Sequence, residues 1–236
     1  MKKLGRLLGR DRVLIVTAVE VERQAILRGL GQPENVPAEE ALAAGDRVVV
    51  AAAGVGVAAA AAATSRYLTI AHTAGEPFDA VINAGIAGGF ADRVDVGGIV
   101  IGTRSIAADL GADSPDGFLT LDELGFGSST MAADEDLLNA LRVVLPAARI
   151  GDVLTLSTVT GTTTAMEVLN RRHPNALAEA MEGYGVATAA EQAGAAFVEL
   201  RTISNPVGPR DRAAWRIPAA LAALTTAAGE LATVTG

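Results

Sequence analysis

Short apolar runs alternate along the chain with segments in which apolar residues recur every three or four positions. Such runs, ended by glycine, polar or charged residues, are typical of strands covered on both faces, and the recurring segments are typical of helices. Asp134 is the expected N-cap of one helix. Residues 107–133 are rich in Gly, Asp and Ser and predict a loop. We expect strands at 13–18, 48–53, 80–84, 99–106, 150–156, 176–180 and 197–204, and helices at 21–30, 57–74, 134–145, 165–170, 182–193 and 218–233.

The alternation of strands and helices predicts an α/β fold in which helices cover both faces of a mostly parallel sheet. The length of 236 residues suits one domain, 1–236, with residues 1–11 as a basic N-terminal extension. Ligands of such sheets bind beyond the carboxyl ends of the strands. The candidate site residues are therefore Glu20, Glu22, residues 54–56, 85–89 and 157–164, Met181, Glu182, Ser204 and Asn205.

The composition excludes several classes of protein. The chain has no cysteine, which excludes disulfides and thiolate metal sites. Neither His72 nor His173 has a second ligand at metal spacing, so we expect no metal. The net charge of -8 argues against nucleic-acid binding. No stretch reaches the roughly 18 uncharged apolar residues of a membrane span, and none has signal-peptide character, so we expect a cytoplasmic protein.

Two polar residues stand out in apolar surroundings. Glu182 lies between Met181 and Gly183 in an otherwise apolar stretch, where a carboxylate needs a partner or a ligand. Asn205 and Pro206 end the last predicted strand. Asn-Pro favours a turn, but an amide also offers a pocket one donor and one acceptor. The residues alone leave both interpretations open.

Two further features have a structural and a functional interpretation. Glu20 and Glu22 lie where a strand gives way to a helix, and an acidic residue there often only complements the helix dipole. Residues 54–59 match G-x-G-x-x-A, as in dinucleotide-binding folds. The acidic residue expected after the next strand is absent, because that strand ends in Asn83. A tight turn is therefore favoured, and a dinucleotide-dependent oxidoreductase stays an alternative.

Five segments in order resemble the nucleoside phosphorylase and nucleosidase superfamily over residues 13–232: "TAVEVE", "AGVG", "INAGIAGG", "AMEGYGVA" and "LRTISN". They are most similar to the branch that cleaves methylthioadenosine and adenosylhomocysteine. "DLGADSPDGF" and "ISNPVGPRDR" resemble the futalosine hydrolase family of an alternative menaquinone pathway. The resemblance implies a three-layer α/β/α sandwich around a central twisted mixed sheet. It also implies cleavage of a purine N-glycosidic bond without a cofactor, by a homodimer or higher homo-oligomer.

The resemblance also implies roles for single residues. Glu22 matches the carboxylate that activates the attacking water, and Glu182 matches the one that holds the ribose hydroxyls. Met181 matches a residue that packs under the sugar. The other expected substrate-binding residues are Gly85 and Ile86 in the glycine-rich segment, and Thr160 and Gly161 beside the purine.

Asn205 matches an aspartate of the adenine-releasing relatives. An amide can donate to O6 of a 6-oxopurine while accepting from N7–H, whereas an ionised aspartate offers acceptors only. The mismatch costs about 1–3 kcal/mol. The sequence therefore predicts hydrolysis of futalosine to hypoxanthine and dehypoxanthine futalosine.

A methylthioadenosine-type nucleosidase, a purine nucleoside phosphorylase and a non-catalytic nucleoside binder are alternatives. The positions that hold phosphate in the phosphorylases align with Asn83 and Ile86, which supply no cation. The candidates for the 5′ substituent are Arg104, Arg210, Arg212, Phe126 and Trp215, and the sequence does not rank them. Relatives borrow part of that pocket from a partner subunit.

Overall fold

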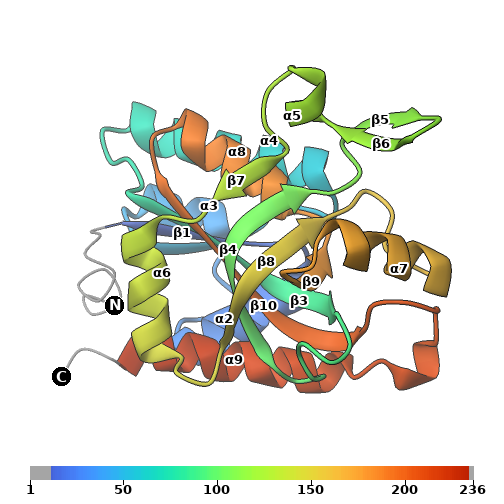
Figure 1. Ribbon diagram of the computed structural model, residues 1–236. Coiled ribbons are helices and arrows are strands. Elements are labelled where there is room, and N and C mark those ends of the chain that lie inside the picture. Colours follow the sequence, from blue (N-terminus) through green and yellow to red (C-terminus); the bar gives the residue numbers. More distant parts are fainter. Residues whose placement is uncertain (1–11, 234–236) are drawn as a thin grey trace.

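The structure is a computed structural model that describes residues 12–233 (Figure 1). The expected basic extension at residues 1–11 lies outside the described residues. The strands are β1 (Val13–Thr17), β2 (Val48–Ala52), β3 (Ala80–Gly89), β4 (Ile99–Ala107), β5 (Gly111–Ser114), β6 (Gly117–Thr120), β7 (Thr130–Ala132), β8 (Arg149–Thr155), β9 (Ala176–Ala180) and β10 (Ala196–Pro206). The helices are α2 (Glu20–Leu30), α3 (Ala38–Ala43), α4 (Val57–Thr73), α5 (Leu121–Leu124), α6 (Glu135–Val144), α7 (Thr163–Arg172), α8 (Gly183–Gln192) and α9 (Ile217–Thr233), with a 3-10 turn at Arg212–Ala214.

The central sheet is mixed and partly closed on itself. Its order is β10-β4-β8-β9-β3-β1-β2, with β7 beside β4, and β10 pairs additionally with β3. The pairs β1–β2, β1–β3, β3–β10, β4–β8 and β8–β9 are parallel, and β4–β10, β3–β9 and β4–β7 are antiparallel. Strands β3, β10, β4, β8 and β9 therefore form a ring, and the site described below lies where several of these strands end.

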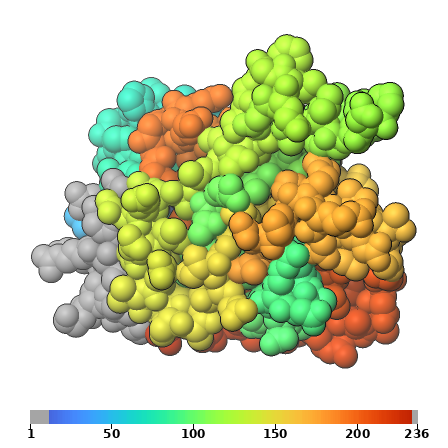
Figure 2. Space-filling model, in the orientation of Figure 1, coloured from blue at the N-terminus to red at the C-terminus, as the bar shows by residue number. Residues whose placement is uncertain are grey.

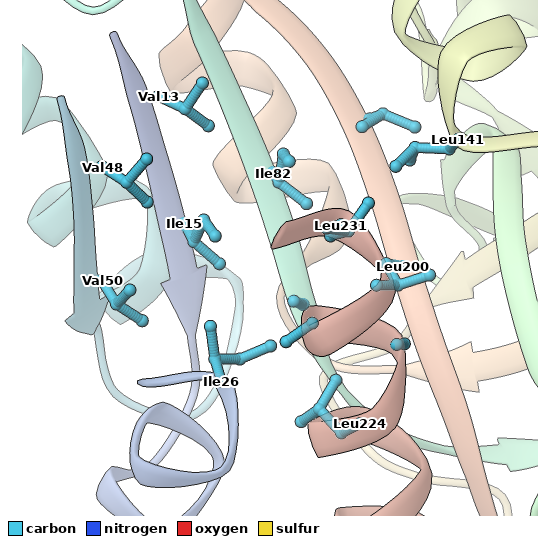
Figure 3. Close-up of a cluster of buried hydrophobic side chains, with 14 of the residues drawn as sticks. Val13, Ile15, Ile26, Val48, Val50, Ile82, Leu141, Leu200, Leu224 and Leu231 are labelled. Carbon is cyan, nitrogen blue, oxygen red and sulfur yellow. The ribbon is translucent and has the colours of Figure 1, made fainter. Parts of the chain in front are cut away.

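Helices cover both faces of the sheet, because successive strand residues point to opposite sides. On one face, Ile26 of α2, Leu141 of α6 and Leu224 of α9 pack against Ile15, Ile82 and Leu200 of the sheet (Figure 3). On the other face, helices α4 and α8 contribute Leu68 and Val186, which pack against the neighbouring strand positions Leu14 and Val81. The expected three-layer sandwich with a mixed sheet is thus confirmed (Figure 1).

Each strand and helix expected from the sequence is present. The bounds of β9 are as predicted and those of the others are shifted. Asp134 caps α6 by accepting a hydrogen bond from Leu137 N–H. The prediction that strand 80–84 ends before the glycines is wrong, because β3 continues through them to Gly89. A Cβ on Gly89 would lie 2.7 Å from Ile203 Cγ2. The glycines therefore allow close strand contact and do not mark a turn.

The prediction of a loop at 107–133 is also wrong, because this segment holds β5, β6, α5 and β7. Thr120 begins α5 and exchanges hydrogen bonds with Glu123 in a capping box, and β7 pairs with β4. Figure 2 shows the β5–β6–α5 segment projecting from the body of the molecule. Helix α3 was not expected either.

No helix within residues 12–233 is long and apolar enough to span a bilayer.

Candidate active site

A cavity of about 390 Å³ opens where β1, β3, β9 and β10 end. Its walls include apolar side chains such as Val19, Val55 and Trp215. Seven of the eight residues expected at the site line it. They are Glu22, Ile86, Thr160, Gly161, Met181, Glu182 and Asn205.

Glu22 is buried at the start of α2, with 2% of its surface exposed. Its Oε2 accepts from the N–H groups of Ala18 and Val19 at 3.0 and 3.1 Å, and its Oε1 accepts from Ile86 N–H at 2.8 Å. Burial raises the pKa of Glu22, while the Ile86 N–H and the charge of Arg201 oppose this change. The Glu22 carboxylate therefore accepts from the backbone N–H groups that precede α2 and also lines the cavity.

Glu182 is the second buried carboxylate, 4% exposed, between β9 and α8. Its Oε1 accepts from Gly56 N–H at 3.2 Å, and its Oε2 lies 3.3 Å from Met181 N and from Arg201 Nη2. Gly56 belongs to the G-x-G-x-x-A segment, for which the sequence favours a tight turn, and its N–H group holds the Glu182 carboxylate. Gly54 and Gly56 both have φ near +93°, which favours glycine.

Arg201 lies between these carboxylates and a third one on its own strand. The Arg201 guanidinium is 1% exposed and contacts Glu199 Oε1 at 2.8 Å and Asn83 Oδ1. Glu199 is fully buried and also accepts from Ser105 Oγ. Burial alone would lower the pKa of Arg201, but the neighbouring glutamates raise it, and burial raises the pKa of Glu199. The guanidinium therefore compensates buried negative charge.

Gly85 does not line the cavity but lies directly behind it. A Cβ at Gly85 would lie 2.7 Å from Glu22 Oε1 and 2.9 Å from Arg201 Nη1. In the structure Gly85 packs against these two side chains, and its contact with substrate stays a prediction. A glycine is needed here because the carboxylate and the guanidinium both approach the backbone.

Asn205 is half-buried at the end of β10. Ser204 Oγ lies 2.7 Å from Asn205 Oδ1 and 3.2 Å from Ala87 O, and Asn205 Nδ2 donates to Pro206 O at 3.0 Å. These bonds fix the amide and leave one N–H and one oxygen lone pair for a ligand. Asn205 therefore bonds to its sequence neighbours Ser204 and Pro206 and also lines the cavity.

Glu179, also buried, lines the same wall from β9. Its Oε1 accepts from Thr160 N–H at 2.7 Å, and Thr160 Oγ1 contacts its Oε2. Burial raises the pKa of Glu179, and the two bonds to Thr160 oppose this rise. This carboxyl group places a hydrogen-bond acceptor on the pocket wall.

The structure separates the candidates for the 5′ substituent. Arg210 and Trp215 line the cavity, and the Arg210 guanidinium carbon lies 5.8 Å from the Trp215 ring centroid. Arg212 contacts the same ring at 5.7 Å, but Arg212, Arg104 and Phe126 do not line the cavity. Arg104 instead pairs with Asp152 at 2.5 Å.

The sequence interpretation missed three charged residues of the site region: Glu179, Glu199 and Arg201. The sequence could have indicated each of them, because a charged residue in an apolar strand needs a partner. Glu199 and Arg201 are two positions apart, so both lie on the same face of β10. Among residues 12–233, no group of three His, Asp or Glu side chains is placed to hold a metal.

Comparisons with known proteins identify the family of this chain. The sequence profile of the phosphorylase superfamily matches residues 12–235. The chain is 50% identical over 225 residues to a futalosine hydrolase of Streptomyces coelicolor, covering 94% of this chain and 95% of that protein. It is 46% identical over 216 residues to a futalosine hydrolase of Acidothermus cellulolyticus, covering 88% and 85%.

The fold is similar to the native structure of the futalosine hydrolase of Helicobacter pylori, with a TM-score of 0.73 at 18% identity over 94% of this chain and 95% of that one. This chain thus belongs to the phosphorylase superfamily and, within it, to the futalosine hydrolase family.

Proposed function

We propose that this enzyme hydrolyses the N-glycosidic bond of futalosine and releases hypoxanthine and dehypoxanthine futalosine for menaquinone biosynthesis. One observation carries the proposal. A single cavity is lined by two buried carboxylates, Glu22 and Glu182, and by the amide of Asn205. The 50% identity to a futalosine hydrolase supports it.

Glu22 acts as the general base. Three backbone N–H groups hold its carboxylate in one orientation at the cavity wall. Water attacks the anomeric carbon, its proton passes to Glu22, and the bond to N9 breaks with its electron pair leaving on the purine. Positive charge develops on the ribosyl ring, and the negative charge of Glu182 stabilises it.

Glu182 holds the ribose hydroxyls. Gly56 N–H and Arg201 fix its position, and Oε1, which accepts one bond from Gly56, keeps a lone pair for the sugar hydroxyls. Charge-assisted bonds of this kind are stronger than neutral ones. Met181 packs beside the sugar from the same turn.

Water is the nucleophile because the site cannot accommodate a phosphate dianion. Arg201 is the buried guanidinium behind Glu22, and it already pairs with Glu182 and Glu199. A phosphate there would face these carboxylates and Glu22, and like charges in a buried site repel strongly. Asn83 is fully buried, with its amide bonded to Val16 O and Arg201. Its side chain therefore does not reach the cavity.

Asn205 selects the 6-oxopurine. Its amide donates to O6 and accepts from N7–H, and the N7 proton comes from water because an amide is no acid at neutral pH. The test is Asn205→Asp, assayed with futalosine and with aminofutalosine, its 6-amino counterpart. We expect the ratio of kcat/KM for futalosine to kcat/KM for aminofutalosine to fall about tenfold or more. An unchanged ratio would contradict this role.

Arg210 and Trp215 receive the 5′ substituent. Futalosine carries an aromatic carboxylate there. Arg210 is the one basic side chain among the described residues that line the cavity, and Trp215 offers an aromatic face beside it. A guanidinium is suited to bind a carboxylate because its planar fork matches the two oxygens.

The enzyme assembles as a homodimer or a higher homo-oligomer in the cytoplasm. The family resemblance supports this assembly. The projecting β5–β6–α5 segment (Figure 2) is the candidate contact surface, and Phe126 next to α5 is 79% exposed. Light scattering during size-exclusion chromatography tests it, and a monomer at micromolar concentration would contradict it.

A further inference from the structure

We propose that Glu179 reads the N1–H group of the purine and is, beside Asn205, a second specificity-determining residue of this site. The inference rests on the proposed function and deepens it. A 6-oxopurine carries a hydrogen at N1, whereas a 6-aminopurine has an acceptor there. The residue that faces N1 must therefore be an acceptor for the first and a donor for the second.

Strand register places Glu179 and Asn205 on either side of one glycine. Gly88 of β3 pairs with Glu179 of β9 and, on its other side, with Asn205 of β10. Directly paired residues direct their side chains to the same face of a sheet. The two Cα atoms are about 10 Å apart, twice the spacing of neighbouring strands. Both side chains line the one cavity.

Gly88 places no side chain between them. A Cβ at this position would lie 3.0 Å from Val207 Cγ2 and 3.5 Å from Asn205 Nδ2, so a larger residue here would displace Val207 and the Asn205 amide. A purine that presents N7 and O6 to Asn205 presents N1, on the adjoining edge, to β9. Glu179 is the buried polar side chain of β9 on that wall.

Glu179 also changes the polarity of the neighbouring backbone. Thr160 N–H is a donor in the cavity wall, and without Glu179 it would suit the N1 acceptor of a 6-aminopurine. Glu179 Oε1 takes this donor at 2.7 Å, and Thr160 Oγ1 contacts Oε2. Each carboxyl oxygen accepts more than one bond. The wall therefore presents an acceptor to N1 where the bare backbone would present a donor.

The two residues then read neighbouring edges of the base. Asn205 meets N7 and O6, and Glu179 meets N1–H. Neither contact alone excludes a 6-aminopurine strongly, because each mismatch gives about a tenfold to hundredfold change. Together they discriminate at two positions of the base, the substituent at C6 and N1.

The test replaces Glu179 by methionine, which is close in size and has no acceptor oxygen. The readout is the ratio of kcat/KM for futalosine to kcat/KM for aminofutalosine. We expect Glu179→Met to lower this ratio about tenfold to a hundredfold, because futalosine loses its N1–H partner and the released Thr160 N–H suits aminofutalosine. A purely structural role would reduce both rates by the same factor.

Asp109→Asn is the matched control. Asp109 is an exposed carboxylate outside the cavity that accepts from Ser157 N–H at 2.7 Å, three residues before Thr160. It holds the same segment without facing the base, so its substitution leaves the ratio within about twofold of the wild type. Glu179→Gln provides a milder variant should the methionine variant fail to fold. Its neutral amide is expected to lower the ratio about threefold to tenfold.

The outcomes separate this inference from the proposed function. If the wild type cleaves neither nucleoside, the proposed function is wrong. If the wild type releases hypoxanthine from futalosine but the folded Glu179 variant keeps the wild-type ratio within about twofold, the inference is wrong and the proposed function stands.

Discussion

Replacing Glu22 by glutamine removes the proposed base and keeps the size of the side chain. We expect kcat for futalosine to fall about 10²- to 10⁴-fold, the usual contribution of a positioned general base. This corresponds to about 2.7–5.5 kcal/mol in the activation barrier. Steady-state release of hypoxanthine measures it.

The hydrogen bonds of Glu22 set the accompanying change in stability. The carbonyl of a glutamine can accept from Ala18 and Val19 N–H, but its NH2 group then faces the N–H of Ile86. One buried donor without an acceptor costs about 1–3 kcal/mol. Loss of the buried charge offsets part of this cost, because burial disfavours the ionised carboxylate. At about 2–4 °C per kcal/mol for a chain of this length, the lost hydrogen bond alone would lower Tm by about 2–12 °C, and the offset reduces this fall.

Glu20→Gln is the control, the same substitution in the first turn of the same helix. Glu20 is exposed and pairs with Arg23 at 2.8 Å. Such a pair contributes about 0–1 kcal/mol, so activity stays within about twofold of the wild type. A folded Glu22→Gln enzyme that keeps more than a tenth of the wild-type kcat would refute the assignment of Glu22 as the base.

Three further predictions test neighbouring features. Gly85→Ala lowers kcat about 100-fold or more, because the new Cβ would lie 2.7 Å from Glu22 Oε1 and must displace it. The control is Gly229→Ala in α9, where the new Cβ would lie at an ordinary 3.5 Å from the Gly29 carbonyl oxygen, so we expect full activity. An equal loss of kcat in both variants would contradict the explanation by displacement of Glu22. Because the base must be ionised and burial raises the pKa of Glu22, kcat/KM falls with decreasing pH at a midpoint above the ordinary glutamate value of about 4.3. A midpoint at or below about 4.3 in the pH profile would contradict the assignment of Glu22 as the ionised base. Arg210→Ala raises KM for futalosine about tenfold. Arg212 lies beside the same tryptophan but outside the cavity, so Arg212→Ala changes KM less than about threefold. A larger effect of Arg212→Ala would exclude Arg210 as the residue that binds the 5′ substituent.

The hydrophobic pattern predicted the main strands and helices because each buried segment must cover its apolar face against another element. It failed where glycine has a packing role. Gly85 to Gly89 read as the end of a strand, although in the structure they are strand residues between β9 and β10. It also failed for β5, β6 and α5, whose capping box and short hairpin carry no apolar periodicity.

The candidate site was predictable where a residue type is unusual for its position. Glu182 and Asn205 interrupt apolar segments, and Glu22 lies at the carboxyl end of a strand, and all three line the cavity. Arg201 could not be placed from the sequence, because its position depends on strand order. The ring that β10 closes with β3 brings Arg201 beside Gly85. The contact of Glu179 with Thr160 likewise depends on the pairing of β9 with β8.

The central claim is that this site uses water to release hypoxanthine from futalosine. The most direct measurement is base release from futalosine, aminofutalosine, methylthioadenosine and inosine, each with and without phosphate. We predict hypoxanthine from futalosine at a rate that phosphate does not change, and rates at least about tenfold lower with the 6-aminopurine nucleosides. Release that requires phosphate, or adenine from methylthioadenosine as the preferred product, would contradict the account.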